Sequence, residues 1–180
     1  MRDKAPSFGK EIIHTKNIYN QDMMKRILFI LTLLAIVAGA SAQEAYNEAI
    51  RMARDVVDDT SKPLDMRKVA QFKYDALYYM GRQAMKTMPN DPSSILDYQA
   101  RALFQFMNLF YGQYTMSTKR DKPAVIEYFK KISLAHPLFN DQNKSYVLAY
   151  LTFPGAITQF SLDTDWVAAY NDIRKGMPQK

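Results

Sequence analysis

The stretch from Ser94 to Tyr114 constrains the fold most strongly, because its apolar residues recur at intervals of three and four positions. This spacing stacks side chains on one face of an α-helix. The residues that show it are Ile95, Tyr98, Ala102, Leu103, Phe106, Leu109 and Phe110. Phe104, Met107 and Tyr111 widen the apolar face until neighbouring elements have to cover the helix on more than one side. The pattern predicts a central, largely buried helix.

Similar amphipathic segments on either side predict an all-α domain of antiparallel helical hairpins, with about six or seven helices. Only six Gly and eight Pro occur in the chain, which leaves room for long helices. We expect helices over 44–59, 65–87, 123–135, 146–153, 156–160 and 166–175, with the fourth and fifth of these forming two short helices or one kinked helix at Pro154 and Gly155. Short loops favour antiparallel neighbours, in either a compact bundle or an α-solenoid.

The segment 24–42 has the three parts of a secretory signal peptide. A basic start at 24–26 precedes an apolar run over 27–37, and the small residues at 40–42 predict cleavage between Ala42 and Gln43. The run is shorter than the roughly 20 apolar residues that span a membrane. We therefore predict membrane contact only before cleavage, and a single helical domain over 43–180 that is periplasmic or secreted and soluble. Residues 1–23 form a polar extension, which we interpret as a misplaced start codon.

Charge and cysteine content exclude several classes of protein. The formal charge is +6, but the first 42 residues hold six Lys and Arg against three Asp and Glu, which leaves 18 against 15 in the rest. These charges are mixed along the chain, so no basic stripe for nucleic acid is expected. The chain has no cysteine, which excludes disulfides, thiolate metal sites and a lipid-modified cysteine at the cleavage point.

Two short patterns resemble parts of a tetratricopeptide repeat (TPR), a 34-residue pair of antiparallel helices. Leu77, Met80, Gly81 and Ala84 resemble the first-helix pattern, with Gly81 where close helix contact requires a small residue. The segment 129–137 resembles the end of a second helix. The two parts are too far apart for one repeat, so the resemblance is to divergent TPR-like hairpins over about a third of the mature chain. It implies a TPR-like α-α superhelix whose concave surface binds peptides or proteins.

No catalytic, cofactor or metal site is expected from the sequence. The mature chain has one histidine, His136, which we interpret as a residue at a helix end. Asp163, Asp165 and Trp166 form the most suggestive group, because paired acids beside an indole could hold a calcium ion or a sugar ring. The alternative is an ordinary acidic helix start in which Asp163 caps the last helix. The oxygen ligands and Gly of a calcium loop do not follow.

Tyrosines supply the remaining candidate site. Tyr74, Tyr78, Tyr111 and Tyr114 could line a groove between helices for a peptide or glycan, or could simply cover the core. We expect an exported, non-catalytic binding or scaffold protein with a protein or peptide partner in the bacterial cell envelope. The alternative is an accessory that binds or processes glycans, an enzyme class, with Asp163 and Asp165 as acids. A third possibility is a purely structural envelope component.

Overall fold

The chain is described by a computed structural model that covers residues 44–153 and 155–176. These residues form six helices and no strand, which confirms the all-α class. The helices are α2 (Glu44–Asp58), α3 (Leu64–Thr87), α4 (Ser93–Met116), α5 (Lys122–Leu134), α6 (Lys144–Thr152) and α7 (Trp166–Gly176). The predicted signal peptide 24–42, the cleavage site Ala42–Gln43 and the extension 1–23 lie outside the described residues.

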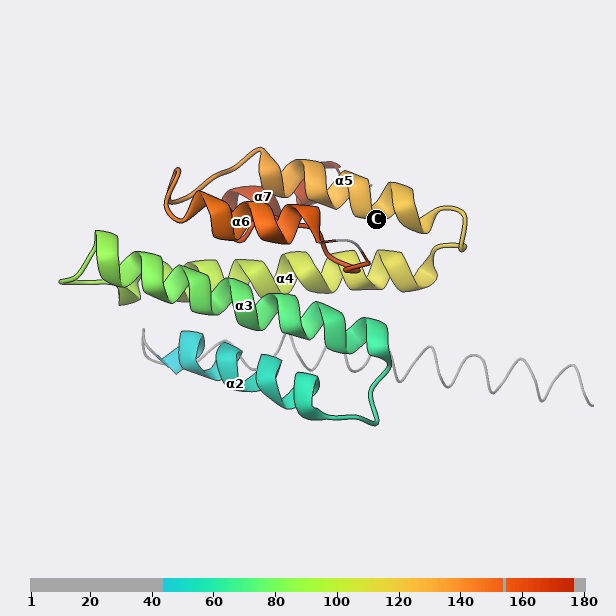
Figure 1. Cartoon of the computed structure of the whole chain (residues 1–180), viewed down its shortest axis with the longest axis horizontal. Helices are drawn as coiled ribbons and strands as arrows, with labels where there is room; N and C mark the ends of the chain where they lie inside the picture. The colour runs from blue at the N-terminus through green and yellow to red at the C-terminus, as the bar shows by residue number, and fades with distance from the viewer. Residues whose placement is uncertain (1–43, 154, 177–180) are drawn as a thin grey trace, which may run out of the picture. The chain divides into compact units, whose positions relative to one another are not determined.

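The six helices pack in three layers (Figure 1). Helix α2 forms one layer, α3 and α4 form the middle layer, and α5, α6 and α7 cover the other side. Helix α4 contacts α2, α3, α5 and α7, so the stretch with the strongest apolar pattern is the central helix. The arrangement follows from its wide apolar face, which has to be covered from both sides.

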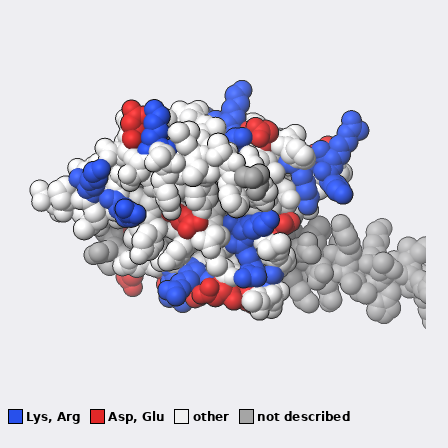
Figure 2. Space-filling view, in the orientation of Figure 1, with Lys and Arg blue, Asp and Glu red and all other residues white. Residues whose placement is uncertain are grey.

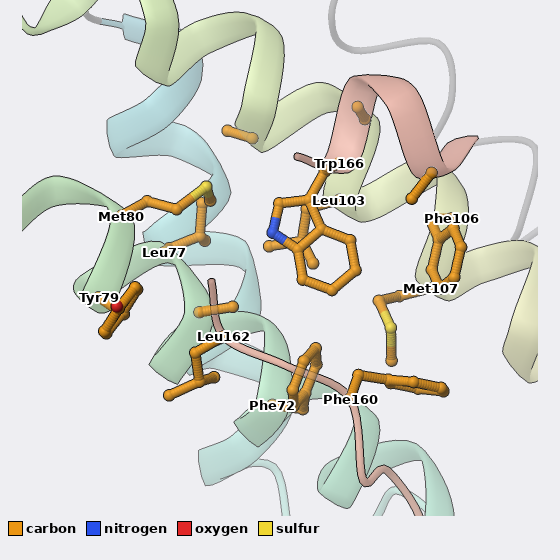
Figure 3. Close-up of a cluster of buried hydrophobic side chains, with 14 of the residues drawn as sticks. Phe72, Leu77, Tyr79, Met80, Leu103, Phe106, Met107, Phe160, Leu162 and Trp166 are labelled. Atoms are coloured by element: carbon orange, nitrogen blue, oxygen red, sulfur yellow. The ribbon is translucent and has the colours of Figure 1, made fainter. Parts of the chain in front are cut away.

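The centre of the core is a group of aromatic rings (Figure 3). The ring of Trp166, at the start of α7, meets Phe72 of α3 at 5.9 Å and Phe106 of α4 at 5.5 Å between centroids. Phe160 meets the same two phenylalanines at 5.5 and 5.9 Å. All four contacts are edge-to-face, the arrangement that aromatic pairs prefer. These rings are fully buried and join α3, α4 and α7.

The predicted short helix over 156–160 is wrong. Helix α6 ends at Thr152, and the residues from Ala156 to Asp165 are not helical. The apolar side chains of this segment are still buried, and Phe160 and Leu162 enter the core from an irregular backbone (Figure 3). A segment this short forms too few helical hydrogen bonds to offset the cost of starting a helix. The sequence therefore predicted that apolar side chains of this segment are buried, but it did not predict the conformation of their backbone.

Candidate functional site

Two adjoining cavities lie where α3 ends, at the end of the bundle where α2, α4 and α6 begin. The larger, of about 480 Å³, is lined by α2, α3 and the start of α4. The smaller, of about 210 Å³, is lined by α3 and the start of α6. Tyr78 and Arg82, one helical turn apart on α3, line both cavities. We call the residues that line either cavity the Tyr78 site: Tyr46, Asn47, Tyr78, Tyr79, Gly81, Arg82, Gln83, Met85, Pro92, Ser93, Leu96, Asn143, Ser145 and Tyr146.

The larger cavity combines apolar surface with a single charge. Tyr78 is 56% exposed and Met85 is 60% exposed, so both offer accessible surface to a ligand. Among the described residues that line either cavity, Arg82 is the only charged one. Its guanidinium makes no hydrogen bond or ion pair with any residue that the structure describes. The site therefore presents an unpaired cation beside an apolar hollow.

Tyr46 connects α2 to α3 at the edge of the larger cavity. Its hydroxyl donates a hydrogen bond to the Leu77 carbonyl oxygen at 2.6 Å, and its backbone N–H donates to Asp97 Oδ1 at 3.0 Å. A Cβ at Gly81 would overlap the Tyr46 hydroxyl, so the close contact depends on glycine. Burial, together with the neighbouring Tyr78, raises the pKa of Tyr46 to about 12. The first turn of α2 is thus fixed to both middle helices.

Beside the smaller cavity lies a buried polar atom that has no hydrogen-bond partner among the described residues. Gln83 is 1% exposed, and its Oε1 accepts no hydrogen bond from the residues that the structure describes. An unsatisfied buried acceptor costs roughly 1–3 kcal/mol, which is why such groups are rare in folded proteins. Gln83 lines a polar cavity in which Asn143 and Ser145 supply further polar atoms. The Oε1 atom itself has almost no solvent-accessible surface, so a molecule in the cavity does not reach it.

The start of α6 is placed against α3 by Tyr79. Its ring stacks on Tyr146 with 6.2 Å between centroids and 12° between planes. Its hydroxyl donates to the carbonyl oxygen of Gln142 in the preceding loop. Asn140 and Asn143 in this loop have positive φ, a conformation that asparagine tolerates better than most residues. The loop thereby brings the start of α6 beside the end of α3.

The four tyrosines named from the sequence have different surroundings. The rings of Tyr74 and Tyr78 are neighbours on α3, with 5.7 Å between centroids. Tyr114 instead lies under Lys122 Nζ at 4.3 Å, and its pKa is raised by burial and by the charge of Asp65 at the start of α3. Tyr111 is half-buried against the core. Only Tyr78 of the four lines the two cavities.

Asp163, Asp165 and Trp166 form internal contacts. Asp163 is buried, its Oδ1 accepts a hydrogen bond from the Phe139 N–H at 2.7 Å, and burial raises its pKa. Asp165, and not Asp163, caps α7, because its Oδ1 accepts from the Ala168 N–H at 3.1 Å. Trp166 is fully buried, so its indole has no surface to offer a sugar ring. These residues tie α7 to its neighbours.

His136 also has a structural partner. Its Nε2 lies 2.7 Å from Asp172 Oδ2 of α7, and its carbonyl oxygen accepts from the Asp165 N–H at 2.6 Å. Lys175 and His136 together hold the pKa of Asp172 below its ordinary value. In the part of the chain that the structure covers, no three His, Asp or Glu side chains are placed to hold a metal ion.

A second unusual group is the amine of Lys73, buried between α3 and α4. Its Nζ donates to Asn108 Oδ1 at 2.8 Å and lies 4.5 Å from the centre of the Phe104 ring. Burial lowers its pKa from 10.5 to about 7. Neither cavity of the Tyr78 site reaches it. Nothing in the sequence distinguishes Lys73, because its neighbours in the chain are those of an ordinary helix.

The sequence alone also did not identify four residues that line the cavities: Tyr46, Arg82, Gln83 and Met85. For Arg82, however, the sequence holds a clue in the residues at helical spacing from it. Residues three and four positions away on a helix are its neighbours on the surface. For Arg82 these are two tyrosines, Met85 and Lys86. The helix therefore supplies no acidic partner for this cation, and the lack of one could have been read from the sequence.

Surface charge on the visible face is mixed (Figure 2). Lys and Arg side chains stand apart or beside acidic ones and form no continuous stripe there. No helix within the described ranges is both long and apolar enough to cross a membrane. Comparison with protein-family models, curated proteins and solved structures gave no match.

Proposed function

We propose that this chain is an exported, non-catalytic binding protein that binds a protein or peptide partner of the cell envelope at the Tyr78 site. The observation that carries the proposal is the pair of cavities that share Tyr78 and Arg82. An exposed aromatic residue beside an apolar hollow, with few placed polar groups, is the usual composition of a binding site. The resemblance to TPR hairpins agrees with a peptide as the ligand.

The volume of the larger cavity supports a ligand of limited size. About 480 Å³ lies within the range of roughly 300–1,000 Å³ that is typical of small-ligand pockets. It suits one or two side chains of a partner. A cavity that takes a few anchoring side chains also agrees with the expectation that a few central residues dominate the energy of an interface.

Affinity capture from an envelope extract, with single-residue variants, tests the proposal. Tyr78→Ala should abolish retention of a partner that the wild-type protein captures. Tyr98→Ala is the matched control, because Tyr98 is 71% exposed but lines neither cavity. Circular dichroism should show that both variants are folded. Equal retention by Tyr78→Ala and the wild type would contradict the proposed location.

Export is part of the same proposal and has its own test. N-terminal sequencing of the protein recovered from fractionated cells should give a chain that begins at Gln43 in the periplasm or the medium. Recovery of the chain in the cytoplasm with residues 24–42 attached would contradict export. Neither result depends on the identity of the partner.

A further inference from the structure

Helix α6 is attached to the bundle more weakly than the other five described helices. It lies in the outer layer (Figure 1) and makes the fewest contacts with other helices. Of its nine residues only Val147 is buried. Leu148 and the following Phe153 are large apolar residues that remain exposed. A helix shorter than about 12 residues is marginal by itself, so the order of α6 depends on the few contacts that it makes.

The inner side of α6 covers aromatic side chains of α3. The Tyr150 ring meets Phe72 edge-to-face at 5.7 Å between centroids, and Tyr146 stacks on Tyr79. Phe72 and Tyr79 are both buried, and they lie about two helical turns apart on the same side of α3. Tyr79 and Tyr146 also line the smaller cavity. Displacement of α6 would therefore join this cavity to an aromatic surface of α3.

The ends and the attachments of α6 suit a movement of this kind. Asn143 before the helix has a φ of 52°, and Gly155 after it has a φ of 83°. Asparagine and glycine tolerate this region, and a few such positions can absorb the change in backbone angles at a hinge. Within the described residues, one side-chain hydrogen bond joins α6 to another helix, from the Tyr150 hydroxyl to Asp75 Oδ2 of α3.

We infer that α6 is a lid of the Tyr78 site. It moves away from α3 while the other helices stay packed, and an apolar segment of the partner then occupies the smaller cavity and contacts Phe72 and Tyr79. Because Tyr146 and Tyr150 cover these two rings in the closed form, the partner binds the fraction of molecules in which α6 is open. This inference rests on the proposed function and adds the regulation of its site.

Thiol labelling of the full-length chain tests whether α6 opens by itself. The chain has no cysteine, so each variant carries one reactive thiol. Val147→Cys lies under α6, Ala149→Cys lies on its exposed side, and Ala76→Cys lies in the core on α3. Circular dichroism should show that all three variants are folded.

Iodoacetamide should modify Val147→Cys about 10- to 100-fold more slowly than Ala149→Cys, and at least about 100-fold faster than Ala76→Cys. Low urea should accelerate Ala76→Cys far more, because global unfolding exposes more surface than the opening of α6. The lid is overturned if Val147→Cys and Ala76→Cys share one rate and one urea dependence, since α6 then opens only when the protein unfolds. Equal rates for Val147→Cys and Ala149→Cys also overturn it, because α6 then has no closed form.

Tyr150→Phe tests the attachment of the lid. This change removes the hydrogen bond to Asp75 and keeps the ring that packs on Phe72. It should accelerate the labelling of Val147→Cys about tenfold. Tyr128→Phe is the matched control, since it removes a tyrosine hydroxyl from α5 and should leave this rate unchanged. No acceleration in Tyr150→Phe, or the same acceleration in Tyr128→Phe, contradicts the lid.

The dye anilinonaphthalene sulfonate, which binds accessible apolar surface, reports what the opening exposes. Tyr150→Phe should bind the dye more tightly than the wild type, by about the factor by which labelling is accelerated. Faster labelling with unchanged dye affinity would mean that the open form offers no apolar site, which overturns the inference.

Affinity capture from an envelope extract separates the lid from the proposed function. Tyr150→Phe should retain more of a partner than the wild type at limiting concentration, and Tyr78→Ala should retain none. If Tyr78→Ala loses the partner while Tyr150→Phe retains no more than the wild type, the Tyr78 site stands and the lid is wrong. If Tyr78→Ala retains as much as the wild type, the site itself is wrong, whatever the labelling rates are.

Discussion

Replacement of Lys73 by methionine should stabilise the protein at neutral pH. Lys73 is 7% exposed, and Asn108 is its hydrogen-bond acceptor. A buried amine is disfavoured in its charged form, because the interior solvates the charge less well than water does. Burial accordingly lowers the pKa of Lys73 from 10.5 to about 7. Methionine has a similar length and carries no charge, so it fills the same space without this cost.

The pH dependence of stability follows from the direction of this change. The unfolded chain keeps the Lys73 proton up to about pH 10.5, whereas the folded chain releases it from about pH 7. Between these values the unfolded state binds more protons, so the free energy of unfolding rises with pH and falls as pH returns to 7. The two pKa values correspond to about 5 kcal/mol over the whole window. Between about pH 7 and pH 9.5, we expect the titration of Lys73 to raise the free energy of unfolding by about 2–4 kcal/mol.

Urea unfolding followed by circular dichroism measures this difference. Wild type and Lys73→Met are compared at several pH values between about 7 and 9.5, and the difference between them cancels the titration of other groups. The wild type should gain stability relative to the variant as pH rises. Lys86→Met, at an exposed lysine of the same helix, should follow the wild type. If the free energies of unfolding of the wild type and Lys73→Met changed in parallel with pH, the pKa of Lys73 would not be lowered by folding.

Two further substitutions test the contacts of α2 and α7, both by urea unfolding. Gly81→Ala should lower the free energy of unfolding by about 1 kcal/mol despite the better helix propensity of alanine, because the new Cβ displaces the Tyr46 hydroxyl from its hydrogen bond. The loss should shrink in a Tyr46→Phe background, and an undiminished loss would point to another cause. Asp165→Ala should cost about 1–3 kcal/mol, since Gln99 Nε2 and the first turn of α7 both lose their acceptor. Unchanged stability would show that this cap is dispensable.

The long helices could be predicted because their apolar residues repeat with the helical period over many turns. The stretch 94–114 was expected to be central, and α4 does occupy the middle of the bundle. The helix predicted after Pro154 does not form, and the reason is physical. Ile157 and Phe160 have helical spacing, but Gly155 takes a φ of 83° and the apolar run is too short to form a helix by itself.

The candidate site was less predictable, because it is assembled from distant parts of the chain. Tyr78 could be named from its place on a helix, but the contribution of Tyr46 depends on how α2 packs against α3. The position of Tyr146 depends on the loop that Tyr79 holds. Asp163 was expected at a helix start, where acids are usually exposed. Asp163 is instead buried, and its carboxylate accepts a hydrogen bond from the N–H of Phe139, a residue distant in the sequence.

Site-specific photo-crosslinking in living cells tests most directly whether the Tyr78 site is where a partner binds. Met85→p-benzoylphenylalanine places the photoreactive group in the larger cavity, and the same change at Tyr98 places it on exposed surface outside the cavities. Our account predicts a discrete crosslinked product from position 85 that Tyr78→Ala eliminates, and none of that mass from position 98. The same product from both positions, or one that persists in Tyr78→Ala, would contradict the assignment of this site.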